Sequence, residues 1–103
     1  MTQPNELPQR TNVAMTPDVE VGVYADFVGV WHQPGCFVLD FSSWIRPPQL
    51  GRSDDGQQVV DLSARVVSRV RIPPSQVFEL MKALETQLSA WERETGSRPP
   101  PQD

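Results

Sequence analysis

The sequence predicts one α+β domain in which a three-stranded antiparallel meander is followed by a long C-terminal helix packed on the sheet. Apolar residues alternate with period two in three segments, which is typical of strands. In the last third of the chain they recur at spacings of three and four, which is typical of a helix. A length of 103 residues leaves room for one core and no second domain.

The first two strands are predicted to form a hairpin. Alternation from Val19 to Trp31 indicates the first strand, and its second half is apolar on both sides. Gln33-Pro34-Gly35 has the residues of a tight turn, and the run Cys36–Phe41 that follows indicates the returning strand.

A charged segment with two prolines and two glycines, residues 45–58, is expected to be a surface loop. The third strand is then predicted over Val59–Ile72. Its even positions are mostly apolar, and its odd positions include three arginines.

The helix is predicted from Pro74 to about Thr95. Pro73 and Pro74 end the preceding strand, and Gly96 is a plausible helix terminator. One continuous apolar stripe follows the helix; it comprises Val77, Met81, Leu84, Leu88 and Trp91. We expect residues 18–95 to form the domain, with a flexible arm over 1–17 and a flexible proline-rich tail over 96–103.

One helix covers only one face of a three-stranded sheet, so a second apolar face remains to be hidden. The sequence assigns Tyr24, Val28, Val30 and Val38 to that second face, with Trp44 as a further candidate. Because exposed apolar patches of this kind usually mark interfaces, we expect a symmetric homodimer, built by sheet-face packing, edge pairing or helix exchange.

Three parts of the sequence together carry a family resemblance. They are the run from Val23 to His32, the segment Phe37-Val38-Leu39-Asp40-Phe41, and the arginine-rich run Arg65–Val70 before a helix that begins with proline. In this order they resemble a bacterial family catalogued as a domain of unknown function, number 3467. The resemblance implies a compact cytoplasmic bacterial domain, and it supplies no activity, cofactor or catalytic residue. The sequence departs from the family pattern at Pro73, where a serine commonly stands.

Charge and cysteine content narrow the classes of function. The net charge of −4 disfavours a protein drawn by its overall field to nucleic acid or to an anionic membrane. A single cysteine forms no internal disulfide, and no apolar stretch approaches the length of a membrane span, about 18 residues. The first residues lack the pattern of a secretory signal. We therefore expect a cytoplasmic protein with no membrane partner.

The sequence offers no constellation for catalysis. His32 and Cys36 flank the proline turn, but a metal site needs three or four converging ligands. We therefore expect no catalytic residue, no metal and no cofactor, so the protein is not predicted to be an enzyme. Asp40 lies within an apolar strand, where a carboxylate needs a partner; Arg65 or Arg69 on the third strand is predicted to form a structural ion pair with it.

The arginine row on the third strand is the one basic segment. Residues 59–72 contain Arg65, Arg69 and Arg71 against a single acidic residue. With Tyr24, Val28 and Val30 these arginines are predicted to form a possible interaction face. The leading hypothesis is a non-enzymatic, dimeric protein-interaction module whose protein partner is unidentified. One alternative is nucleic-acid binding through the arginines. Another, on fold analogy alone, is a holder of unfolded chains similar to bacterial export chaperones.

Overall fold

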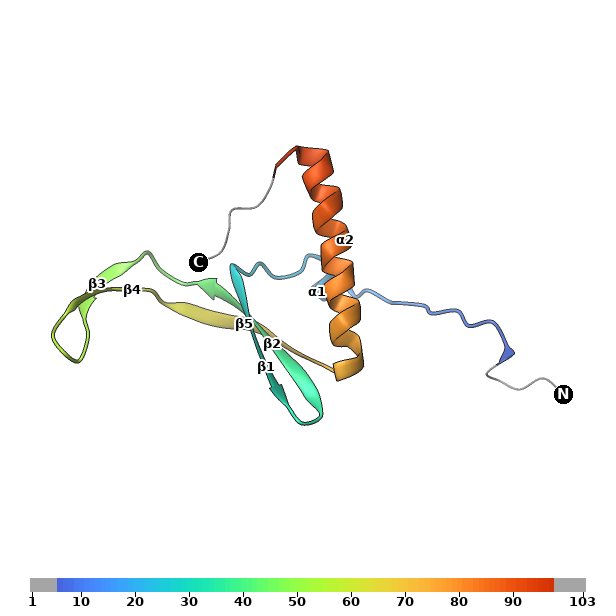
Figure 1. Ribbon diagram of the computed structural model, residues 1–103, viewed down its shortest axis with the longest axis horizontal. Helices are drawn as coiled ribbons and strands as arrows, with labels where there is room; N and C mark the ends of the chain where they lie inside the picture. The colour runs from blue at the N-terminus through green and yellow to red at the C-terminus, as the bar shows by residue number, and fades with distance from the viewer. Residues whose placement is uncertain (1–5, 98–103) are drawn as a thin grey trace.

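Two antiparallel sheets and one long helix make up the fold (Figure 1). The computed structural model describes residues 6–97. The elements, in chain order, are α1 (Pro17–Glu20), β1 (Phe27–Gln33), β2 (Cys36–Trp44), β3 (Gln49–Arg52), β4 (Gln58–Asp61), β5 (Ala64–Ile72), the 3₁₀ turn η2 (Pro74–Gln76) and α2 (Val77–Thr95). The α+β class and the meander of the main sheet are as predicted, since the strand order is β1-β2-β5.

Strand β2 is the centre of the main sheet. It pairs with β1 from Gln33↔Cys36 to Phe27↔Ser42, so only Pro34 and Gly35 form the hairpin loop. On its other edge β2 pairs with β5. Within residues 6–97, Val38 on this strand is the one apolar side chain that is fully buried, at 0% exposure.

A β-bulge divides β5 into two parts. The register runs from Phe37↔Ile72 to Phe41↔Ser68 and then shifts, so that Ser42 pairs with Val66. The extra residue, Val67, reverses the side of the sheet to which the earlier residues of β5 point. The even positions of the predicted third strand therefore do not share one face, which corrects the sequence-based expectation.

Strands β3 and β4 form an arm that projects from the main sheet (Figure 1). The sequence predicted a loop over residues 45–58, and this was wrong for Gln49–Arg52, which pairs with Gln58–Asp61. The Ile45 N–H donates to the Ser63 carbonyl (3.1 Å) and continues the ribbon between the arm and the sheet. The predicted strand over Val59–Ile72 is accordingly two strands, β4 and β5.

The first strand begins later than predicted. Residues Pro17–Glu20 form one helical turn, and β1 starts at Phe27 rather than at Val19. Two hydrogen bonds hold the segment before β1 against the end of β2. Asp26 Oδ2 accepts from the Trp44 N–H (2.9 Å), and the Ser43 hydroxyl donates to the Tyr24 carbonyl (2.7 Å).

Local chemistry sets both ends of α2. Pro74 begins the 3₁₀ turn that leads into the helix, as its fixed φ favours. Gly96 has a φ of 67°, and its N–H donates to the Glu92 carbonyl, so the chain leaves the helix in a left-handed conformation. The helix ends at Thr95, as predicted. The expected arm over 1–17 and tail over 96–103 lie partly outside the described residues.

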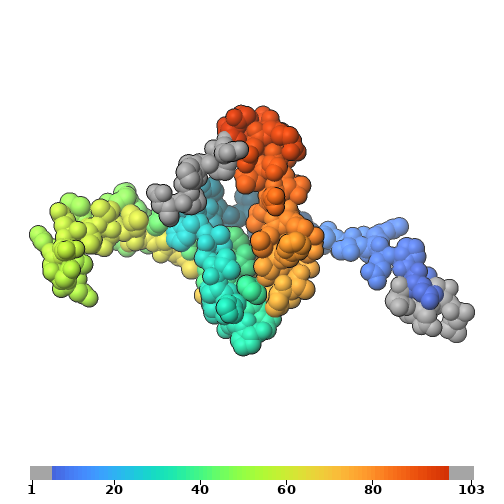
Figure 2. All heavy atoms as spheres, viewed as in Figure 1, coloured from blue at the N-terminus to red at the C-terminus, as the bar shows by residue number. Residues whose placement is uncertain are grey.

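The helix is not packed over the sheet, which corrects the prediction. Only the N-terminal half of α2 approaches the sheet, and the C-terminal half stands clear of it (Figure 2). Met81 and Leu84, at the middle of the apolar stripe, are 59% and 62% exposed. The stripe that was expected to complete the core is therefore largely in water.

The chain is extended and leaves much surface uncovered. Its Cα radius of gyration is 20.0 Å, whereas a compact domain of this length has about 13 Å. It exposes 9518 Å² to solvent. A compact protein of this length exposes about 5,800 Å², so roughly 3,700 Å² more than expected stays in water. A single copy therefore buries only a small apolar core within residues 6–97.

The start of the helix provides a test of local stability. Pro73 stands at the N-cap of η2 in extended conformation and forms no side-chain cap. Replacing it by serine (Pro73→Ser) supplies a hydroxyl for the free N–H groups of the first turn, so we expect the free energy of unfolding of Pro73→Ser to exceed that of Pro73→Ala by about 1 kcal/mol. Urea denaturation of Pro73→Ser and of the uncapped control Pro73→Ala measures this. Equal stability of the two variants would show that no cap forms.

Candidate functional site

An apolar groove lies between the helix and one face of the main sheet. The cross-strand pairs Val28↔Phe41, Val30↔Leu39 and Leu39↔Val70 put their side chains on this face, which we call the groove face. The apolar residues of the groove face are Val28, Val30, Phe37, Leu39, Phe41, Val70 and Ile72.

The second wall of the groove comes from α2. Val77, Leu80, Met81 and Leu84 face the groove face across a space of about 280 Å³, and every residue that lines this space is apolar. The helix stripe predicted as core thus forms one side of an open groove. A groove of this composition offers no general acid, base or nucleophile, and it suits an apolar partner.

The opposite side of the sheet carries a hydrogen-bonded ion pair, and we call it the ion-pair face. Asp40 accepts from Arg69 through Nε (2.6 Å) and Nη2 (3.0 Å), and Trp31 Nε1 donates to the same carboxylate (3.1 Å). The Arg69 guanidinium also lies 5.6 Å from the centre of the Trp31 ring. These three side chains interlock across β1, β2 and β5.

The ion pair shifts the pKa of both of its members. The hydrogen bonds from Arg69, and then that from Trp31, hold the pKa of Asp40 below its ordinary value. The carboxylate in turn raises the pKa of Arg69. The Asp40 side chain is 17% exposed and that of Arg69 48% exposed, so solvent screens the pair only in part.

The arginines do not form the single face that the sequence predicted. Arg69 lies opposite Asp40 in the strand register, and Arg71 lies opposite Val38, so both arginines are on the ion-pair face. Arg65 pairs with Ser43 beyond the bulge, so it lies on the groove side. Arg65 is therefore not the partner of Asp40. Arg71 donates to the Gln33 side-chain oxygen (3.2 Å).

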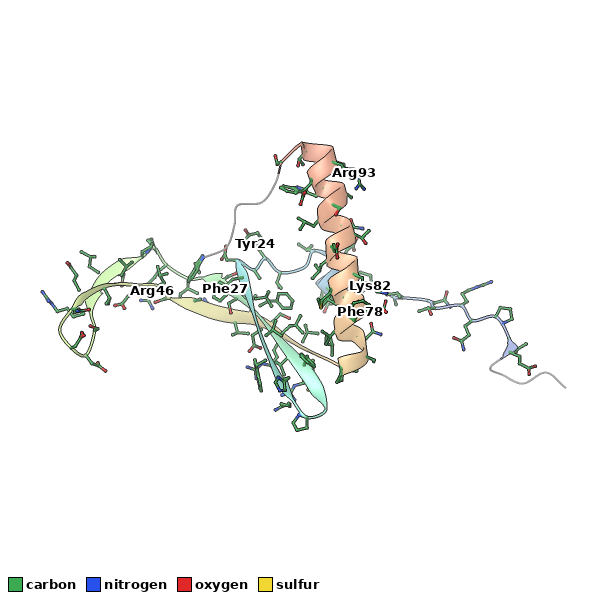
Figure 3. All side chains as sticks on the ribbon, in the orientation of Figure 1. Tyr24, Phe27, Arg46, Phe78, Lys82 and Arg93 are labelled. Carbon is green, nitrogen blue, oxygen red and sulfur yellow. The ribbon has the colours of Figure 1, made fainter. Side chains whose placement is uncertain are left out.

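The apolar members of the predicted interaction face are also separated from the arginines. Val28 and Val30 lie on the groove face, opposite Arg69 and Arg71, while Val38 is buried on the ion-pair face. Tyr24 precedes β1 and lies with Phe27 at the end of the sheet from which the arm projects; Arg46 lies at the base of that arm (Figure 3). Val28 and Val30 therefore line the groove together with α2 and do not share a face with Arg69 and Arg71.

The remaining candidates for chemistry do not converge. Among residues 6–97, no three His, Cys, Asp or Glu side chains are grouped as a metal ion would require. His32 packs against Phe37, with ring centres 5.6 Å apart, and the Cys36 thiol donates to the Gln33 side chain. Over the same part of the chain, no helix has the length and apolar character needed to cross a membrane.

Fold and groove together define a small α+β sheet-and-helix module with an unfilled apolar surface. The chain belongs to the family described as "Protein of unknown function (DUF3467)", whose pattern matches residues 1–97. No curated protein and no solved structure matches it.

The Asp40–Arg69 pair predicts a pH-dependent contribution to stability. Because the pKa of Asp40 is lowered in the folded state, the pair stabilises the fold above the unfolded-state pKa of about 3.9, and this contribution is lost as pH falls through the lower folded-state pKa. We expect Asp40→Asn to lower the urea midpoint at pH 7 and to flatten its decline below pH ~4.

Asp54→Asn, at an exposed carboxylate in the turn of the arm, is the matched control. It should leave both the midpoint and its pH profile close to those of the wild type. Identical pH profiles for Asp40→Asn and the wild type would show that the pair contributes nothing to folding.

Proposed function

We propose that the protein is a non-enzymatic interaction module that works as a homodimer and binds another protein. The observation that carries the proposal is the open apolar groove, whose two walls, the groove face and the helix stripe, stay exposed in a single copy. Large apolar surfaces of soluble proteins are usually covered by a partner.

The amount of exposed surface supports self-association. A stable dimer buries about 800 Å² on each copy. The excess of exposed surface in one copy is larger than this, and it includes the exposed segment before β1 and the β3–β4 arm as well as the groove. Surface left over after dimerisation is then available to a partner protein.

The geometry gives less support to the two alternatives. Arg69 is held by Asp40, and Arg65 lies on the other side of the sheet, so the arginines form no continuous basic stripe. The groove has the apolar lining that a holder of unfolded chains needs, but this is equally the lining of a dimer interface. We therefore propose the homodimeric module as the primary function.

The test is the oligomeric state in solution. Sedimentation at micromolar concentration should give the mass of a dimer for the wild type. Leu84→Lys puts a charge on the exposed helix stripe; it should cost a single copy under about 0.5 kcal/mol, yet weaken the dimer by roughly tenfold or more.

Thr86→Lys, on the far side of the same helix, is the control and should remain dimeric. A monomeric wild type would refute the proposal. Equal dimer strength in the two lysine variants would remove the helix stripe from the interface.

A further inference from the structure

The main sheet ends in two free edges of very different character. In the order β1-β2-β5, strands β1 and β5 each have one edge without a neighbour among residues 6–97. Such an edge presents unpaired N–H and C=O groups to any strand that approaches, and proteins protect it with charges, bulges or a cover.

Strand β5 is protected, and β1 is not. Strand β5 contains three arginines, Arg65, Arg69 and Arg71, and the bulge at Val67, all of which discourage pairing. Strand β1, with the sequence FVGVWHQ, contains no Asp, Glu, Lys, Arg or Pro, and all seven of its residues are exposed. An apolar, uncharged edge of this length would aggregate unless it were covered.

The hairpin geometry identifies the groups that are free. Gln33 and Cys36 flank a two-residue loop and so form a hydrogen-bonded pair, and the pairs alternate from there along β1. The backbone groups of Phe27, Gly29, Trp31 and Gln33 consequently point to β2. Those of Val28, Val30 and His32 point outward, to the free edge.

We propose that two copies pair antiparallel through β1, about a two-fold axis at Val30, to form one continuous six-stranded sheet. This inference rests on the proposed homodimer and specifies how it forms. Val30 then pairs with Val30 of the second copy, and Val28 pairs with His32 of the second copy. The outward backbone groups of all three residues thereby gain hydrogen-bond partners.

The same arrangement joins the two grooves. A two-fold axis perpendicular to the sheet keeps the groove face of both copies on one side. Val28 and Val30 line the groove and also lie at the junction between copies, so the two grooves meet there. Both helices then lie over the same side of the sheet, and the apolar walls contribute the area that edge pairing alone does not supply.

Proline at the free edge tests the pairing. Val30→Pro removes an outward N–H and leaves the hydrogen bonds to β2 in place. Each dimer carries the change twice, so we expect the dissociation constant to rise about 100-fold or more. Val30→Ala, which keeps the N–H, and Arg71→Pro, on the free edge of β5, should remain dimeric by sedimentation.

A dimer that survives Val30→Pro refutes pairing through β1 and leaves the homodimer itself standing. Dissociation by Arg71→Pro in place of Val30→Pro would assign the pairing to β5. A wild-type monomer would refute both this inference and the proposed function. The three outcomes are therefore distinguishable.

A cross-link keeps the test decisive if Val30→Pro does not fold. In a hydrogen-bonded antiparallel pair the two Cα atoms are about 5.5 Å apart, within the range that a disulfide spans. In a Cys36→Ser background, mild oxidation of Val30→Cys should give a covalent dimer on a non-reducing gel, and Arg71→Cys should not. The reverse pattern would overturn the proposal.

Discussion

The main constraint on this fold is that one copy buries very little apolar surface. Strand β2 has neighbours on both edges, and its Val38 is the one fully buried apolar residue of the described chain. Everything else that is apolar, including the groove face and the helix stripe, has water on at least one side. Because burial of apolar surface is the main favourable term in folding, the proposed homodimer would add to the free energy of folding by covering part of this surface.

The two sides of the main sheet are held by different kinds of interaction. On the ion-pair face, Asp40, Arg69 and Trp31 satisfy one another across three strands and fix their register without help from outside. The side chains that line the groove are all apolar, so specificity there has to come from shape.

Much of the fold could be predicted from the sequence. The Pro34–Gly35 turn, the period-two pattern of β2 and the helix terminator Gly96 each reflect interactions within a few residues. The structure has the hairpin and the helix end where these patterns indicate. The candidate site could be predicted only in part. The helix stripe was recognised, but as part of a closed core rather than as a wall of an open groove, and Val28 and Val30 were assigned to the sheet face away from the helix.

The differences have physical causes that a local pattern does not contain. The bulge at Val67 is a property of the pairing between β2 and β5, and it moves Arg65 to the other side of the sheet from Arg69. The arm formed by β3 and β4 depends on cross-strand pairs such as Leu50↔Val60, although its sequence has the composition of a loop. The position of α2 depends on tertiary contacts, which periodicity does not specify.

The short joint before α2 has a mechanical consequence. The helix meets the sheet through Pro73 and the turn Pro74–Gln76, so its direction is set by a few backbone angles rather than by broad packing. Nineteen helical residues form a lever about 28 Å long, and a rotation of about 10° at the joint displaces its far end by about 5 Å. Two consecutive prolines restrict that rotation by fixing φ, and the width of the groove is thereby governed by the stiffness of the joint.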